Sequence, residues 1–313
     1  MKSIMRRFKR LFHVFLLLGG IAGALPAQAA SYVITTIDYP GAKHTAFFGI
    51  SNKGQVVGNA YADDTFFPTI SFVYDSKKNL FTPLPNVPGS DTKAFGINNR
   101  GNVVGYAFDG ITLSGTILDK GAFTIFSHPG LSSTLARAIS TSGLVTGIAI
   151  DDTTGSSFGF IYDPKRGSFT DFLPNLSAFA TGINDRGEVV GSVSLDPDQA
   201  YPGSPYGDYG FLRRKSGAIT LFRVNDHFTR ARGISNSGQI TGVVSDGSKW
   251  KGFVATLATR GGFQSLTIPV GDLLEIPDAI SIFALGINDS GHISGNWIDD
   301  TGAGHGFIAT RTK

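Results

Sequence analysis

One short pattern occurs six times in this chain of 313 residues. It reads Ala-x-Gly-Ile-[Asn/Ser]-x-x-Gly-x-[Val/Ile]-x-Gly, and Gly96–Gly105 and Gly182–Gly191 preserve it best. Every copy keeps the isoleucine and the two later glycines. The first of these glycines recurs at spacings of 42 to 53 residues, at Gly54, Gly101, Gly143, Gly187, Gly238 and Gly291. Fixed positions repeated at such a period indicate a repeat architecture, in which each copy is one supersecondary unit.

Each copy has the sequence character of four short strands, which we name A to D. Strand B ends at the isoleucine of the motif, strand C carries its second half, strand D is a Gly-Phe segment such as Gly159–Tyr162, and strand A follows, as in Ala218–Phe222. These runs are rich in β-branched and aromatic residues and are bounded by Gly, Asp, Asn or Pro. No stretch after the first 29 residues keeps a helical periodicity. The sequence therefore predicts an all-β fold.

The turn between strands B and C explains the polar residue of the motif. Its Asn or Ser can accept hydrogen bonds from the backbone ahead and so cap a type I turn. The glycine three residues later supplies the positive φ that closes such a hairpin. Chain reversal thus accounts for both residues, and we expect no catalytic role for the asparagines.

A unit of four strands and 42 to 53 residues has the size of a β-propeller blade. Six such sheets around one axis cover every face except the outer rim. We therefore expect a six-bladed, propeller-like array of six four-stranded repeats, with residues 30–313 as one domain. A β-solenoid is the alternative, with shorter coils and parallel strands. If the blade begins at strand B, the first strand, Tyr32–Asp38, joins the last blade and locks the ring.

Residues 1–29 have the features of a secretory signal peptide. Five basic residues precede an apolar run, Leu11–Leu25, and Ala27-Gln28-Ala29 forms a cleavage site. A membrane anchor is the alternative, but the run is shorter than the roughly 20 residues that span a bilayer. Removing the leader leaves 22 basic and 24 acidic residues, a net charge of −2 in place of +3. We expect a secreted or periplasmic protein with no membrane span and no nucleic-acid partner.

The residue inventory excludes several chemistries. The chain has no cysteine, so it has no disulfide, no Cys-ligated zinc or iron–sulfur cluster and no cysteine nucleophile. Its histidines are not spaced as metal ligands, and no serine-hydrolase, phosphate-loop or zinc-protease motif occurs. We expect no cofactor. Calcium stays open because Asp-Asp-Thr occurs at 63–65, 151–153 and 299–301, although without an EF-hand pattern.

The Gly-Ile-Asn-x-x-Gly-x-Val-Val-Gly core of Gly96–Gly105 and Gly182–Gly191 resembles the extracellular HAF-repeat family, named for a His-Ala-Phe tripeptide. The nearest match to the tripeptide is His305-Gly306-Phe307. The resemblance covers nearly all of residues 32–311. It implies a secreted, bacterial, propeller-like protein without an established activity, and it brings no catalytic residues.

The loops suggest where a ligand binds. Acidic residues gather in the C–D loops and basic residues in the D–A turns, and the two long insertions, Asp196–Tyr209 and about Pro269–Ser281, fall on the acidic A–B and C–D face. Insertions on one face of a repeat protein often mark its binding side. The candidate ligand-binding residues are Tyr201, Tyr206, Asp208, Tyr209, Trp250 and Trp297. Packing at the rim or in the core is the competing interpretation for these aromatic residues.

Two functions remain. The first is a secreted, monomeric, non-catalytic binding protein for an unknown glycan, peptide or protein. The alternative is an extracellular polysaccharide hydrolase or lyase with carboxylates near the propeller axis, about 5–10 Å apart.

Overall fold

The computed structural model describes residues 32–151, 153–173, 176–195, 207–257, 262–266 and 273–312. Within these ranges the chain forms 24 strands, and β1 (Tyr32–Thr36) comes first. The first two repeats contribute β2 (His44–Ile50), β3 (Gln55–Tyr61), β4 (Ile70–Asp75), β5 (Leu80–Pro83), β6 (Asp91–Ile97), β7 (Val103–Phe108), β8 (Leu113–Asp119) and β9 (Ala122–Phe126). The next two contribute β10 (Ser133–Ile139), β11 (Val145–Asp151), β12 (Ser156–Asp163), β13 (Ser168–Phe172), β14 (Ser177–Ile183), β15 (Val189–Leu195), β16 (Gly207–Arg213) and β17 (Ile219–Val224). The last two contribute β18 (Phe228–Ile234), β19 (Ile240–Ser245), β20 (Trp250–Ala255), β21 (Gly262–Leu266), β22 (Ser281–Ile287), β23 (Ile293–Ile298) and β24 (Gly304–Arg311).

Strands that follow one another pair antiparallel in units of the order B, C, D, A. The first four units are β2 to β5, β6 to β9, β10 to β13 and β14 to β17. In the last unit β22, β23 and β24 are followed by β1, which pairs with β24 from Tyr32 opposite Arg311 to Thr36 opposite Phe307. The unit therefore begins at strand B, and the N-terminal strand completes the last unit, as expected for that case. This antiparallel pairing differs from the parallel coils of a β-solenoid.

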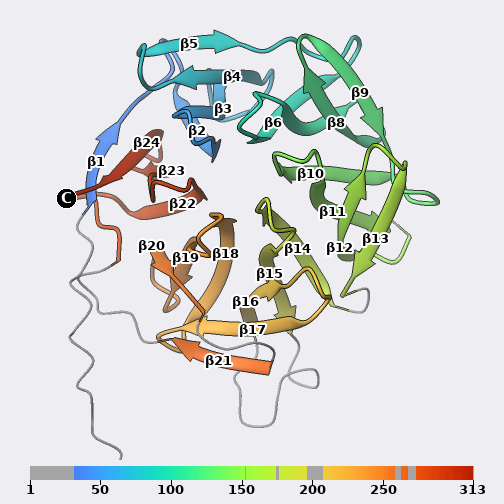
Figure 1. Ribbon diagram of the computed structural model, residues 1–313. Coiled ribbons are helices and arrows are strands. Elements are labelled where there is room, and N and C mark those ends of the chain that lie inside the picture. Colours follow the sequence, from blue (N-terminus) through green and yellow to red (C-terminus); the bar gives the residue numbers. More distant parts are fainter. Residues whose placement is uncertain are drawn as a thin grey trace, which may run out of the picture.

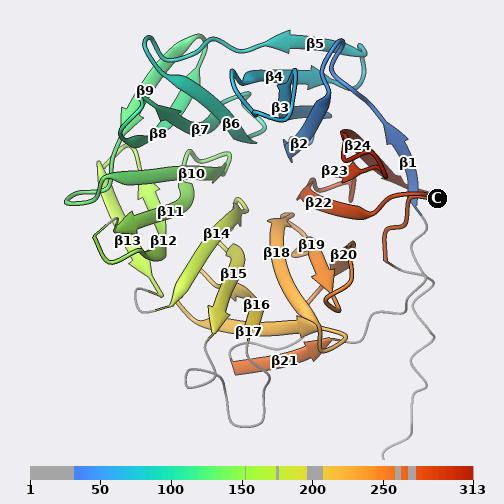
Figure 2. The same ribbon diagram turned by 180° about the vertical axis from the view of Figure 1, so that it is seen from behind.

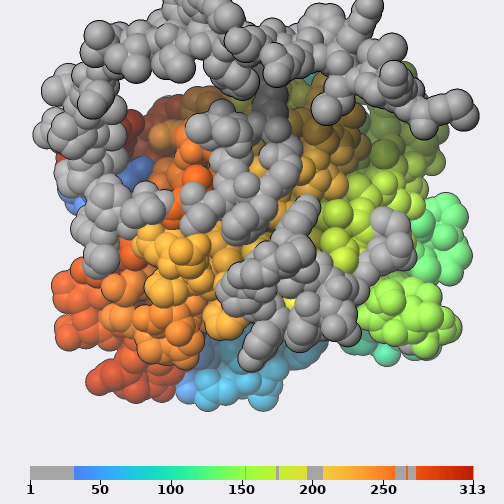
Figure 3. All heavy atoms as spheres, turned by 90° about the horizontal axis from the view of Figure 1, so that it is seen from below, coloured from blue at the N-terminus to red at the C-terminus, as the bar shows by residue number. Residues whose placement is uncertain are grey.

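The fifth unit departs from the expectation of four strands in every repeat. It contains β18, β19 and β20, whereas β21 pairs in parallel with β17, the outer strand of the fourth unit. The segment between β20 and β22 is the longest that joins a D strand to the next B strand, which allows β21 to reach the neighbouring unit. Seen from the side, residues of the fourth and fifth units lie next to each other on the near surface (Figure 3).

The units are arranged around a central axis, with the B strands innermost and β5, β9, β13 and β17 at the rim (Figures 1 and 2). Neighbouring B strands come close where the motif has glycine. A Cβ atom on Gly96 would lie 2.8 Å from Cα of Ala138, and one on Gly286 would lie 2.4 Å from the carbonyl oxygen of Phe48. The second contact joins the last unit to the first.

The core lies between neighbouring units. Phenylalanines of the D strands fill it, and Phe160, Phe211 and Phe253 have no exposed surface. Burial of such a side chain stabilises the fold by about 1.5–3 kcal/mol. The last glycine of the motif lets the backbones of strands B and C approach each other within one unit. A bulge between Ala94 and Gly96 brings the backbone of β6 onto β7, so a Cβ atom on Gly105 would lie 1.8 Å from the carbonyl oxygen of Lys93.

The B–C turns form as the sequence predicts. Oδ1 of Asn98 accepts hydrogen bonds from the backbone N–H groups of Arg100 and Asn102, both at 3.0 Å, and Gly101 has φ of 89°. Asn98 also forms a hydrogen bond that the turn itself does not require. Nδ2 of Asn98 donates to the carbonyl oxygen of Ser140 at 3.0 Å, so the cap of one turn also binds the next unit. Among the described residues, no helix is long and apolar enough to cross a membrane.

Candidate functional site

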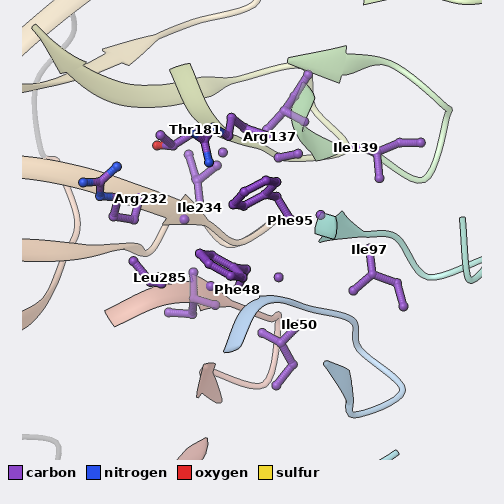
Figure 4. Close-up of a pocket in the computed structure, with 18 residues that line it drawn as sticks. Phe48, Ile50, Phe95, Ile97, Arg137, Ile139, Thr181, Arg232, Ile234 and Leu285 are labelled. Atoms are coloured by element: carbon purple, nitrogen blue, oxygen red, sulfur yellow. The ribbon is translucent and has the colours of Figure 1, made fainter. Parts of the chain in front are cut away.

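The variable residue of Ala-x-Gly-Ile faces the axis in all six units. Together with the two motif residues that follow it, this position lines a cavity of about 230 Å³ between the B strands (Figure 4). The six side chains are Phe48, Phe95, Arg137, Thr181, Arg232 and Leu285. None of the described residues that line this axial cavity carries a carboxylate.

The axial cavity has a polar half and an apolar half. Three consecutive units supply Arg137, Thr181 and Arg232. The other three units supply Leu285, Phe48 and Phe95, and the two phenylalanine rings meet edge to face with centroids 4.7 Å apart. Figure 4 shows the two phenylalanine rings side by side, with Arg137 and Thr181 close together nearby.

Each of the two arginines of the polar half has one buried N–H donor without a hydrogen-bond acceptor. Nε of Arg137 and Nε of Arg232 are buried without a hydrogen bond, and neither side chain forms an ion pair in the part of the chain that the structure describes. The guanidinium of Arg137 lies over the ring of Phe95, 4.2 Å from its centroid. Such stacking leaves the in-plane N–H groups of an arginine free for an anion.

Burial lowers the pKa of both guanidinium groups, and like charge adds to this effect at Arg232. Burial lowers the pKa of Arg232 to about 10; the positive charges of Arg137 and Arg230 lower it as well, while the carboxylate of Asp208 opposes them. Burial also lowers the pKa of Arg137. Both groups stay cationic at neutral pH, so the axial cavity holds two positive charges that no carboxylate of its lining neutralises.

A polar ring closes one end of the axis, at the B–C turns. It consists of the residue after the motif Asn or Ser in each unit, and we call it the belt: Asn52, Asn99, Thr141, Asp185, Asn236 and Asp289. Each member is hydrogen-bonded to the next around the whole circle at 2.6–3.3 Å, and the backbone N–H of Asp289 donates to Oδ1 of Asn52 to join the last unit to the first.

The belt contains two carboxylates, Asp185 and Asp289, which line a small hollow beside the axial cavity. Asp185 accepts from the backbone N–H of Thr141 at 2.6 Å and from Nδ2 of Asn236 at 3.0 Å. Asp289 accepts from the backbone N–H of Asn236 at 2.7 Å and from Nδ2 of Asn52 at 2.6 Å. Both carboxylates therefore hold neighbouring units together.

The structure disperses the candidate residues named from the loops. Tyr201 and Tyr206 lie outside the described residues. Tyr209 lies within β16, is fully buried, and has the guanidinium carbon of Arg223 at 4.3 Å from its ring centroid. Its environment is that of a core residue.

The remaining candidates form two separate groups. Asp208 accepts a hydrogen bond from Nε of Arg230, whose guanidinium lies 4.8 Å from the ring centroid of Trp250. Trp250 is the first residue of β20, strand D of its unit, and so lies neither in strand C nor in the C–D loop. Trp297 lies in β23, stacks on His305 with centroids 4.4 Å apart, and donates to Oγ1 of Thr36. That contact joins the last unit to β1.

Aspartates of the C–D loops accept hydrogen bonds within their own loops. In five C–D loops an aspartate accepts hydrogen bonds from a backbone N–H two residues later: Asp63, Asp109, Asp151, Asp246 and Asp299. A hydrogen bond from the Thr301 hydroxyl is the largest cause that lowers the pKa of Asp299, to about 2. Among the described residues, no three His, Asp or Glu side chains gather as a metal site. The expectation of no cofactor, with calcium left open, stays untested.

Sequence reasoning missed the axial cavity, although a signal for it existed. All six copies keep the isoleucine and the two later glycines, while the x position before Gly-Ile or Ala-Ile holds two phenylalanines, two arginines, a threonine and a leucine. A position that varies within an otherwise fixed repeat is the place where a symmetric scaffold can carry an asymmetric site.

No family model matches the chain, and no curated protein matches it in sequence. Solved structures do match its fold. A protein of unknown function from Dyadobacter fermentans has a TM-score of 0.55 and 13% identity, covering 91% of this chain and 100% of that one. A candidate gluconolactonase has a TM-score of 0.50 and 14% identity, covering 91% and 95%.

A third match is the β-propeller domain of the Trilobed protease from Pyrococcus furiosus, with a TM-score of 0.47, 10% identity, and coverage of 84% and 82%. The chain has an all-β fold that is similar to the first two of these structures. Identities this low show the fold alone, because one fold hosts many functions.

Proposed function

We propose that this protein is an exported, six-bladed β-propeller that binds an anionic ligand in its axial cavity and does not transform it. Six B strands around one axis, the continuous belt and the pairing of β1 with β24 support the blade count and the closure. The leader at residues 1–29 and the resemblance to the HAF-repeat family support export to the periplasm or the outside of the cell.

The observation that carries the proposal is the pair of cations in the axial cavity. Arg137 and Arg232 face the same cavity, and no carboxylate lies in its described lining. Both arginines are half-buried, and partial removal of a charge from water without an ion-pair partner destabilises a fold. Sites that break a packing rule in this way are typical of function, because a ligand supplies the missing partner. Here that partner is an anion.

Binding explains this lining better than catalysis does. A general acid or base needs a pKa near the operating pH, and guanidinium groups stay protonated there. The axial carboxylates that a polysaccharide hydrolase or lyase requires would have to be Asp185 and Asp289. Both are hydrogen-bonded within the belt and lie outside the lining of the axial cavity.

Isothermal titration calorimetry with inorganic phosphate, acetate and benzoate tests the proposal. At least one of these anions is expected to bind the chain without its leader. In the double variant Arg137→Gln, Arg232→Gln the affinity should fall by about 100-fold or more. Arg100→Gln removes the same charge from an exposed B–C turn and should leave the affinity unchanged. The proposal is overturned if no anion binds, or if the double variant binds as tightly as the wild type.

A further inference from the structure

We infer that the ligand is a small aromatic carboxylate, with its carboxylate on Arg137 and Arg232 and its ring against Phe48, Phe95 and Leu285. This inference rests on the proposed function and names the class of anion. Three features of the axial cavity carry it: its division into two halves, its size, and the aromatic character of the apolar half.

The division into halves argues against an inorganic anion. Phosphate or sulfate would satisfy the two arginines but would leave the faces of Phe48, Phe95 and Leu285 in contact with water. Covering apolar surface contributes about 25 cal/mol per Å², so a ligand with an apolar body gains affinity that an inorganic anion cannot. The polar residues come from three consecutive units and the apolar residues from the other three. A bound molecule must therefore be charged at one end and apolar at the other.

The size of the axial cavity limits the apolar body to one ring. The cavity measures about 230 Å³. A dry apolar cavity of about 150 Å³ accommodates benzene, so the remaining space suits one or two carboxylate groups. A chain of several sugars or a folded peptide segment does not fit into this volume. The extended glycans and peptides considered from the loop sequence are thus poor candidates for the axial cavity.

The contacts within the lining favour a flat ring. Phe48 and Phe95 meet edge to face, and the guanidinium of Arg137 stacks on Phe95. Aromatic rings extend such clusters through offset or edge-to-face contacts worth about 0.5–1.5 kcal/mol beyond area burial. A stacked arginine keeps its planar fork of donors for a carboxylate, which it can bind through two parallel hydrogen bonds. An aromatic acid uses both properties in one molecule.

A ligand panel separates this inference from the proposed function. The affinities of benzoate, phthalate, acetate and benzamide are measured by calorimetry on the chain without its leader. Benzoate and phthalate should bind at least about tenfold more tightly than acetate, because only they cover the apolar half. Benzamide should bind at least about tenfold more weakly than benzoate, because it brings no charge.

Two variants locate the ring. Phe48→Ala together with Phe95→Ala should lower the ratio of the benzoate affinity to the acetate affinity to about one, because the apolar half that only benzoate covers is gone; cooperative denaturant unfolding shows whether this variant is folded. If this variant does not fold, Phe48→Leu with Phe95→Leu serves, and there benzoate should still lose more affinity than acetate. If acetate or phosphate binds as tightly as benzoate, the inference is wrong while the proposed function stands. If no anion binds at all, the proposed function itself fails.

Discussion

The belt and the axial cavity are built from the same six repeats, yet their polar side chains differ in how they are satisfied. In the belt each polar side chain finds its partner in the next unit, and the circle of hydrogen bonds is complete. In the axial cavity Nε of Arg137 and Nε of Arg232 are buried without a hydrogen bond, and no carboxylate lies in the described lining. The contrast separates polar residues that join neighbouring units from polar residues whose Nε groups have no partner, which is why we propose a ligand there.

The difference follows from the chemistry of the side chains. The belt consists of Asn, Thr and Asp, which are short and offer acceptors as well as donors. They can therefore satisfy one another across neighbouring turns. Arginine offers five donors and no acceptor, so two arginines cannot satisfy each other. A scaffold can place such a pair at its centre only if other contacts hold it together, and the buried interfaces between units do so.

The largest change in stability is expected for a substitution next to the belt. Asn288 carries the turn that presents Asp289; its Oδ1 accepts from the backbone N–H groups of Ser290 and His292, and its Nδ2 donates to the carbonyl oxygen of Ser51. The bond to Ser51 is buried and the two bonds within the turn are partly buried, so Asn288→Ala, which removes all three, should lower the free energy of unfolding by about 3 kcal/mol. Denaturant unfolding measures this loss.

A matched variant divides that loss. Asn288→Ser keeps an oxygen that can cap the turn, as Ser51 does in the first unit, but removes the bond between units. It should cost about 1 kcal/mol. An equal loss in both variants would show that the contact to Ser51 carries the whole effect, and no loss in either would remove the distinction between the belt and the axial cavity.

The opposite sign is expected in the axial cavity. Arg232→Leu removes an uncompensated charge and fills part of the space with apolar atoms, so without ligand it should raise the free energy of unfolding by about 1 kcal/mol. Arg100→Leu, at an exposed turn, is the control and should change stability by less than about 0.5 kcal/mol. If Arg232→Leu destabilises the protein as Asn288→Ala does, Arg232 is a structural residue and the comparison fails.

Local chemistry made the belt end partly predictable from the sequence. An Asn or Ser three residues before a glycine fixes a capped turn regardless of what surrounds it, and the turn at Asn98 and Gly101 forms as predicted. The role of the first strand, Tyr32–Asp38, was conditional on a unit that begins at strand B, and the pairing of Tyr32–Thr36 with β24 agrees with that case. The pairing of β21 with β17 could not be read in this way, since it depends on a contact between units.

The candidate site was harder to predict for physical reasons. The sequence predicts a loop insertion that runs to Tyr209, but β16 starts at Gly207. Side chains alternate between the two faces of a strand, and the side chain of Tyr209 lies on the face that is buried in the core. The x residue faces the axis because a bulge interrupts each B strand at that position, as between Ala94 and Gly96. A one-residue bulge reverses which side chains face inward, and the alternation of polar and apolar residues does not reveal it.

The smallest effect is expected away from the axis, where β1 closes the ring at the rim. Nδ1 of His305 lies 2.9 Å from a carboxylate oxygen of Asp38, just after β1, and its Nε2 lies 3.3 Å from one of Asp299. Burial alone would lower the pKa of His305, but the hydrogen bonds with the two carboxylates outweigh it, so the pKa is raised. The folded state thus binds the proton more tightly than the unfolded state.

This shift gives a pH dependence of stability with a definite sign. The stabilisation is fully present below the ordinary histidine pKa of about 6.5 and is lost as the pH rises through the raised value. Because the group is partly exposed, the change should be less than about 1 kcal/mol. Denaturant unfolding of wild type and His305→Gln at about pH 6 and pH 8.5 measures it: the two proteins should differ more at the lower pH. If the difference in the free energy of unfolding is the same at both pH values, protonation of His305 does not stabilise the contact between β1 and the last unit. The pairing of β1 with β24 would then hold this contact together.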